Sequence, residues 1–122
     1  MPHNPKRLLV LEKAKVLAID THLACDKHRR SMRDRAPTLR AQILRAVDSI
    51  PLNIGEGASK DSPAAFVYSL DVAIGSSNEV EVQLELAVAI KALPERYACL
   101  IDQVIEVRRM TLGLRKKLLA DS

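Results

Sequence analysis

The sequence predicts an all-α protein that forms one domain over residues 1–122, an up-down-up-down antiparallel four-helix bundle. Hydrophobic residues make up 48% of the chain but aromatic residues only 2%, so the core must be aliphatic, as it commonly is between packed helices. Apolar residues recur every three or four positions along four long segments. Short connections force neighbouring helices to run antiparallel. The expected helices span about 5–30, 37–56, 63–92 and 94–119.

Prolines and a glycine set the limits expected for the first two helices, which a polar linker at 31–36 joins. Pro37 suits the first position of a helix, where its missing N–H would have no partner in any case. Pro51 lies inside the second apolar pattern, where it removes a backbone hydrogen bond and should bend the helix. Gly57 is placed to stop that helix at its C-terminus.

The last two helices have clear start signals. Ser62 and Pro63 form one of them, with serine as the N-cap and proline at the first helical position. Pro94 opens the last helix, whose apolar seam has the spacing of helices that pack at a shallow angle in a bundle. The seam consists of Tyr97, Leu100, Val104, Val107, Thr111, Leu114 and Leu118.

The helix expected at 63–92 is apolar on two nearly opposite faces. Such a helix is covered on two sides, and a single bundle covers only one of them. The second face therefore predicts contact with another subunit, with Val72, Val82 and Leu86 among the contacts, so the protein should not be a monomer. The first face consists of Phe66, Leu70, Ala73, Ser77, Val80, Leu84 and Val88, and the second of Tyr68, Val72, Gly75, Val82, Leu86 and Ile90.

Small and polar residues replace leucine along one edge of the second and third helices. A buried donor or acceptor without a partner costs ~1–3 kcal/mol, so we predict a largely buried, hydrogen-bonded network that fixes the helix register. Asn53→Leu or Glu79→Ala should then destabilise the fold by ~1–3 kcal/mol. A ligand or metal site between the two helices is the other interpretation. The network consists of Ser49, Asn53, Glu56, Ser76 and Glu79.

The sequence contains no recognisable catalytic constellation, and it predicts neither a cofactor nor a metal site. A di-metal site in a bundle would require Glu-x-x-His pairs, and the three histidines lie in or before the first helix. Cys25 and Cys99 are expected to be free thiols that behave as buried hydrophobic residues. No apolar run approaches the ~18 residues of a membrane span, and the start has no signal-peptide pattern, so we expect a cytoplasmic protein without membrane contact.

The net charge of +4 is unevenly distributed. Residues 61–90 contain five acidic residues and no lysine or arginine, so every basic residue lies outside that window. One basic cluster surrounds the first expected loop, and a second lies at 115–117. Such clusters either bind phosphate groups or only solubilise the surface and complement helix C-termini. The first cluster consists of Lys27, Arg29, Arg30, Arg33, Arg35 and Arg40.

The middle of the chain resembles a known family. Residues 49–57 read SIPLNIGEG and residues 75–79 read GSSNE, a pair of motifs similar to those of the four-helix bundle proteins encoded by intervening sequences in bacterial 23S ribosomal RNA genes. The sequence departs from the family pattern at Gly55, where alanine is usual, at Ser77, where leucine is frequent, and in an unusually arginine-rich first linker. The resemblance also includes Gln42, Ile43, Arg45, Ala46, Ser62, Phe66, Leu70, Ala73 and Leu84.

The resemblance implies a small cytoplasmic bundle that assembles into a homopentameric ring and for which no enzyme activity is established. Such proteins are similar to the accessory proteins of diversity-generating retroelements, which are basic pentameric bundles that bind nucleic acid and a reverse transcriptase. A nucleic-acid role follows by analogy with that fold. Recognised RNA-binding motifs and the aromatic stacking platforms of single-strand binders are missing from the sequence.

The sequence leaves three classes of function open. The leading hypothesis is a non-enzymatic homo-oligomer whose basic helix ends, together with Lys91 and Arg96, bind RNA or DNA backbone without sequence preference. The second is a structural or protein-interaction scaffold whose basic residues only solubilise it. The third is an enzyme that uses Glu56 and Glu79. Salt-dependent nucleic-acid binding would separate the first from the second, and a ligand between the second and third helices would support the third.

Overall fold

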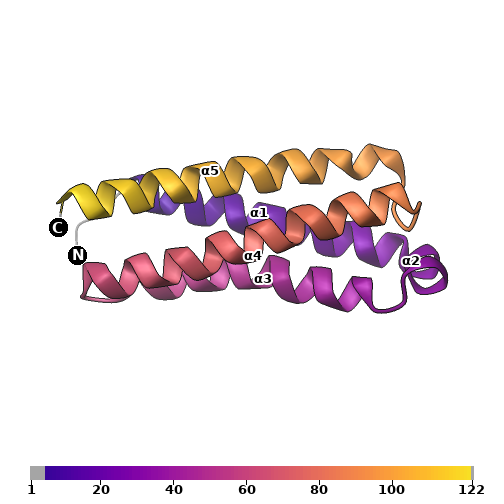
Figure 1. Ribbon diagram of the computed structural model, residues 1–122, viewed down its shortest axis with the longest axis horizontal. Helices are drawn as coiled ribbons and strands as arrows, with labels where there is room; N and C mark the ends of the chain where they lie inside the picture. Colours follow the sequence, from indigo (N-terminus) through magenta and orange to yellow (C-terminus); the bar gives the residue numbers. More distant parts are fainter. Residues whose placement is uncertain (1–4, 122) are drawn as a thin grey trace.

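The computed structural model describes residues 5–121, and within that range every regular element is helical (Figure 1). The all-α class predicted from the sequence is therefore confirmed. Of the described helices, the four long ones lie side by side, and the short α2 lies at an end of the molecule (Figure 1). None of the described helices combines the length and hydrophobicity needed to cross a bilayer. The elements are α1 (Pro5–Lys27), α2 (Arg29–Arg35), α3 (Leu39–Ala58), α4 (Pro63–Ala89), a 3₁₀ turn η1 (Glu95–Tyr97) and α5 (Ala98–Asp121).

The four long helices contact one another in a closed cycle. α1 packs against α3 and α5, and α4 packs against the same two helices, so α1 and α4 lie on one diagonal of the cross-section (Figure 1). Chain direction alternates along the order α1, α3, α4, α5 (Figure 1). The α3–α4 turn lies at the end where α1 begins, and α2 lies at the opposite end, beside the α4–α5 turn (Figure 1).

Aliphatic side chains fill the space between the helices. Leu17, Ile43, Val80 and Val104 come one from each long helix and are fully buried, and Phe66 adds one aromatic ring to this core. Burying a side chain of this size contributes roughly 1.5–3 kcal/mol, so the apolar seams supply most of the favourable free energy of folding. The low aromatic content is therefore compatible with a well-packed core.

The first connection differs from the predicted one. The sequence predicts a helix to residue 30 and a polar linker at 31–36, whereas α1 ends at Lys27 and α2 occupies most of that linker. The reason is Met32, the one apolar side chain of a charged segment, which is completely buried. The chain turns at His28, between the two helices, and α2 places Met32 in the core.

The contact between α3 and α4 is close near the turn that joins them. The sequence predicts Gly57 as a helix stop, but this glycine lies inside α3 and has no positive φ. A Cβ atom at this position would lie 2.7 Å from Ser69 Cβ and 2.8 Å from Phe66 Cδ1, so the glycine is needed for helix contact. The helix stops later, with Ser59 as its C-cap. Pro51 lies within α3, which continues as one helix through it.

Local hydrogen bonds fix both ends of α4. At its start, the Ser62 hydroxyl accepts a hydrogen bond from the Ala65 N–H at 3.3 Å, which confirms the predicted N-cap. At its end, Lys91 has a φ of 65°, and the Leu93 N–H donates to the Ala87 carbonyl at 3.1 Å. A left-handed residue cannot continue an α-helix, so α4 ends before the predicted residue 92.

Two other helix starts lie later than predicted. α3 begins at Leu39 and not at Pro37, and α5 begins at Ala98 because Pro94 precedes only the 3₁₀ turn. α5 also continues to Asp121, slightly past the predicted end. The apolar pattern thus locates each long helix, while caps and turns decide its last residues.

Candidate functional site

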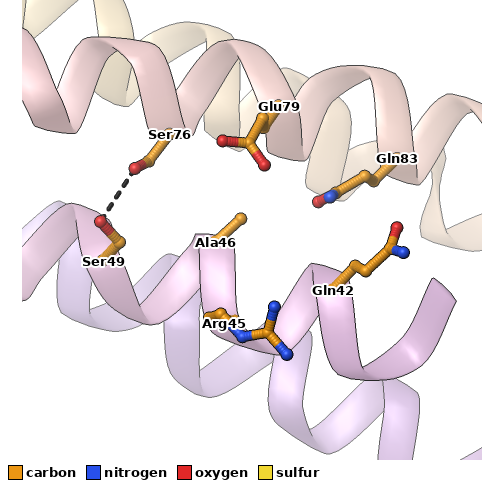
Figure 2. A pocket seen from close by; sticks show the side chains of 7 residues that line it. All are labelled: Gln42, Arg45, Ala46, Ser49, Ser76, Glu79 and Gln83. Atoms are coloured by element: carbon orange, nitrogen blue, oxygen red, sulfur yellow. Dashed lines mark hydrogen bonds between the residues drawn. The ribbon is translucent and has the colours of Figure 1, made fainter. Parts of the chain in front are cut away.

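Three residues of the predicted polar network join α3 to α4. The Asn53 amide donates to the Ser49 carbonyl oxygen at 2.7 Å and to Ser49 Oγ at 3.0 Å. The Ser76 hydroxyl donates to Ser49 Oγ at 2.8 Å (Figure 2). Ser76 is buried, while Ser49 and Asn53 are half-buried. Hydrogen bonds of this kind contribute ~0.5–1.5 kcal/mol each, and the one between Ser76 and Ser49 links the two helices directly.

The two glutamates of the predicted network lie outside it. Glu56 is exposed and forms a 3.6 Å ion pair with Lys60 just after the end of α3. Glu79 is also exposed, and its carboxylate has no hydrogen-bond or ion-pair partner among residues 5–121. The prediction that both are buried is wrong, because an ionised carboxylate is costly to bury without a paired cation. A destabilising effect of Glu79→Ala is accordingly no longer expected.

An open cleft of about 430 Å³ lies between α3 and α4 beside the serine pair (Figure 2). The carbonyl oxygen of the Gln83 side chain is enclosed there without a donor among the described residues. Arg45 and Glu79 face the same cleft without forming an ion pair. The part of the chain that the structure describes holds no cluster of three metal-ligating side chains. The cleft is lined by Gln42, Arg45, Ala46, Ser49, Ser76, Glu79 and Gln83 (Figure 2).

The second apolar face of α4 is uncovered in the single chain. Val82 and Leu86 are 56% and 50% exposed, and Tyr68 is 71% exposed. Val72 is half-buried. This face looks away from the core, as the sequence pattern predicts, and its contact with another subunit stays a prediction.

The predicted basic cluster lies at the end of the molecule formed by α2 (Figure 1). Arg29 and Arg33 are exposed but take part in ion pairs, at 2.8 Å to Asp26 and 3.3 Å to Asp34. The other cations of this end have no ion-pair partner among the described residues. Lys27, Arg30 and Arg35 line an open depression of about 640 Å³ together with His28, Ser31 and Asp34.

Arg40 differs from the rest of the predicted cluster. Its side chain is half-buried on α3, and its Nε atom is enclosed without an acceptor among the described residues. Its charge lies close enough to Cys25 to lower that thiol's pKa, against the larger opposing effect of burial. Arg40 is therefore less available to a ligand than the exposed cations of α2.

A contact that the sequence did not reveal ties the α4–α5 turn to the basic end. The Arg96 guanidinium lies 3.1 Å from His28 Nε2, and the Tyr97 hydroxyl lies 3.2 Å from the same nitrogen. The Ser31 hydroxyl donates to the Lys91 carbonyl at 3.1 Å. These contacts bring Lys91 and Arg96 to the α2 end, as expected from the sequence. In the sequence, the isolated His28 beside the end of α1 was the one residue that could have indicated this contact.

The cysteines are free thiols in different surroundings. Cys25 is buried in α1, and burial raises its pKa to about 11. Cys99 is exposed at the start of α5, which corrects the expectation that both are buried. Cys99 lies outside the apolar seam of α5, because the neighbouring Leu100 occupies the buried position of that seam.

The comparisons with known proteins agree with this architecture. Residues 6–113 match the family model described as 23S rRNA-intervening sequence protein. A crystal structure of a protein with unknown function from the S23 ribosomal protein family of Bacteroides thetaiotaomicron aligns with a TM-score of 0.75 and 23% identity, over 91% of this chain and 98% of that one. No curated protein matches the chain. Neither description names an enzyme activity. Since the family model covers most of its length, the chain belongs to the 23S rRNA-intervening sequence protein family.

Proposed function

We propose that this chain is a non-enzymatic four-helix bundle that assembles with copies of itself and binds the phosphate backbone of RNA or DNA through its α2 end. The observation that carries the proposal is the group of exposed, unpaired cations there. Lys27, Arg30 and Arg35 share one open depression and have no ion-pair partner among the described residues. Exposed cations without an ion-pair partner are available to bind phosphate groups.

The other charged surfaces are partly neutralised within the chain. Asp71 of α4 accepts a hydrogen bond from Arg115 at 2.6 Å, and Glu81 of α4 pairs with Arg108. The acidic helix therefore neutralises arginines of α5, which lie beside it, and not those of α2. This pairing concentrates the uncompensated positive charge at the α2 end.

The chemistry of this end favours backbone contacts over base recognition. Tyr97, the aromatic ring nearest the basic residues, is engaged by His28 in an edge-on contact at 5.2 Å and by the Arg96 guanidinium at 4.8 Å. Phe66 is buried, and Tyr68 lies near the opposite end of α4. At the α2 end, none of the described aromatic rings is thus free to stack with bases. Binding should be tolerant of sequence, because phosphate contacts position a protein without reading bases.

Self-association would multiply this modest site. A cyclic assembly presents the α2 end of every subunit on the same side, and repeated weak contacts then combine through effective concentration. The pentamer implied by the family resemblance would place five copies of the depression on one surface. The uncovered face of α4 that includes Val82 and Leu86 supports the assembly.

The second candidate function is a protein-interaction scaffold without nucleic-acid binding. It is favoured by the ion pairs of Arg29 and Arg33, which reduce the free charge of α2, and by the exposed apolar residues of α4. Both candidates require assembly, so oligomeric state alone does not distinguish them.

A binding titration with paired variants distinguishes the two functions. The parent protein is titrated against labelled single-stranded RNA at low salt, beside Arg30→Gln/Arg35→Gln. The control, Lys116→Gln/Lys117→Gln, removes the same charge from exposed positions at the other end of the molecule. We expect the α2 variant to weaken binding about tenfold and the control to stay within about twofold of the parent.

Two results would favour the scaffold. One is the absence of binding by the parent at low salt, and the other is equal weakening by both variants, which would mean that only net charge matters. Circular dichroism of each variant should match the parent, because the four substituted side chains are exposed.

A further inference from the structure

Uncovered apolar residues form a stripe on α1 as well as on α4. Leu9 and Leu23 of α1 are 51% and 64% exposed, which is comparable with Tyr68, Val82 and Leu86 of α4. Single exposed apolar residues are ordinary, but several of them along one side of a helix indicate a contact surface. The sequence pattern of α1 predicts only its buried face, so the α1 stripe is a finding of the structure.

The two stripes have the same repeat, length and direction. Their residues recur every seven positions, or about two helical turns, so each stripe runs roughly 21 Å along one side of its helix. α1 and α4 run in the same direction and begin at the same end of the molecule (Figure 1). At equal rise per residue, the members of one stripe lie about level with those of the other. The α1 stripe consists of Leu9, Val16 and Leu23, and the α4 stripe of Tyr68, Gly75 and Val82.

The position of the two helices excludes one simple way of covering both stripes. α1 and α4 lie on a diagonal, so their outer faces point in opposite directions (Figure 1). If two copies paired α4 against α4, both α1 stripes would remain exposed to water. A contact between α1 of one copy and α4 of the next covers one stripe of each kind and can be repeated from copy to copy.

Gly75 supplies a shape argument for the same contact. Glycine is disfavoured inside a helix, and Gly75 occupies the middle of the α4 stripe. A Cβ atom there would meet nothing within 4 Å in its own chain, so the position is open to a neighbouring copy. Val16 lies about level with Gly75, and a side chain of that size fits against a helix surface that lacks one.

The unpaired charges beside the stripes are complementary. Among the described residues, Lys13 of α1 has no ion-pair partner, and neither have Glu79 and Glu85 of α4. Of the acidic residues of α1, Glu12 and Asp26 form ion pairs with Lys15 and Arg29, and Asp20 accepts a hydrogen bond from Gln103 at 3.2 Å. The α1 face therefore offers positive charge and the α4 face negative charge, which favours α1 against α4 over either self-pairing.

We propose that the α1 stripe of one copy packs on the α4 stripe of a second copy, with the two helices parallel and Val16 seated over Gly75. This contact deepens the proposed function and rests on the self-association stated there. All copies then point the same way, so every α2 end lies on one side of the assembly.

Engineered cysteines test this contact directly. In a Cys99→Ser background, which removes the exposed thiol, Leu23→Cys and Val82→Cys are introduced singly and together and the proteins are oxidised mildly. The two positions lie on opposite sides of one chain, so an intramolecular disulfide cannot form. We expect a ladder of covalent multimers from the double variant and monomers on denaturing gels from each single variant. Covalent dimers from Val82→Cys alone would show pairing of α4 with α4 and would overturn the proposal.

Substitution of Gly75 tests the α1–α4 contact independently of whether the protein self-associates. Gly75→Leu should reduce the native mass to that of the 13.5 kDa chain, while Gly113→Leu, at another helical glycine with open space around its Cβ position, should leave the assembly intact. If the parent assembles but neither the ladder nor the Gly75 effect is seen, the α1–α4 contact is wrong and self-association stands. If the parent itself is a 13.5 kDa monomer, the α1–α4 contact and the proposed self-association are both wrong.

Discussion

The two cysteines differ in reactivity for a simple physical reason. Burial raises the pKa of Cys25 to about 11, although the nearby Arg40 charge opposes the effect. Cys99 is exposed. The thiolate is the reactive form, and at pH 8 a group with such a raised pKa is almost entirely protonated.

We therefore predict that a thiol reagent at pH 8 labels Cys99 rapidly and Cys25 only after unfolding. Mass spectrometry of the native and the denatured protein, each labelled briefly, checks this. Addition of two labels to the native protein at similar rates would mean that the α1 core opens readily.

His28 is a second residue whose surroundings set its chemistry. Partial burial, and then the positive charges of Arg96 and Lys27, lower its pKa from the ordinary value of 6.5. The folded state therefore takes up the proton less readily than the unfolded state. The stability that depends on neutral His28 is complete above the unfolded pKa, decreases as the pH falls below that value, and is lost once the pH has fallen through the lower pKa of the folded state.

We predict that an NMR titration of His28 gives a midpoint below 6.5 in the parent and a higher midpoint in Arg96→Met, which removes one of the repelling charges. Lys60→Met serves as the control, because Lys60 lies at the other end of the molecule and should leave the midpoint unchanged. A midpoint at or above 6.5 in the parent would contradict the environment described for this ring.

At the scale of helices, apolar spacing predicted the four long segments and the caps could be predicted only in part. Ser62 was identified because a serine before a proline has one dominant structural meaning. Lys91 was not, since lysine gives no local signal for the left-handed φ that precedes the buried Ala92 and Leu93. The single methionine at position 32 was likewise too weak a local signal to predict α2, because its burial depends on the whole end of the core.

Gly57 shows how tertiary packing can change the meaning of a residue. A Cβ atom there would lie 2.7 Å from Ser69 Cβ, a rigid atom of α4, so the helices must separate to accommodate it. We predict that Gly57→Ala destabilises the fold by about 1–3 kcal/mol despite the better helix propensity of alanine. Chemical denaturation measures the effect.

Gly55→Ala is the matched control for that substitution. Its Cβ would lie 3.8 Å from Leu11 Cδ1, an ordinary contact, so helix propensity should dominate and stabilise the protein by up to about 1 kcal/mol. If both variants are stabilised equally, α3 and α4 are not in close contact at Gly57.

At the scale of the candidate site, the sequence predicted the polar pairing but not the position of its charges. Ser49, Asn53 and Ser76 meet as expected, because small polar residues at helical spacing on facing helices have few other partners. Glu56 and Glu79 share that spacing, yet they reach water, which the spacing alone does not reveal. For the same reason, the sequence could not predict that Arg29 and Arg33 form ion pairs or that Arg40 is half-buried.

For the whole molecule, charge and apolar surface are separated in space. Unpaired cations gather at the α2 end, while apolar stripes run along the outer sides of α1 and α4. A molecule built this way can associate through its sides and still present its basic end to a polyanion. That separation is the reason for proposing one assembly with one nucleic-acid surface.

The salt dependence of nucleic-acid affinity tests this central claim most directly. The dissociation constants of the parent protein are measured for two single-stranded RNAs of equal length and unrelated sequence, from about 50 to 200 mM salt. We predict similar affinities for the two RNAs and a linear decrease of the logarithm of the association constant with the logarithm of the salt concentration. The slope should be steeper than the slope that the few phosphate contacts of a single subunit would give. No binding at the lowest salt concentration, or an affinity that salt leaves unchanged, would contradict the account.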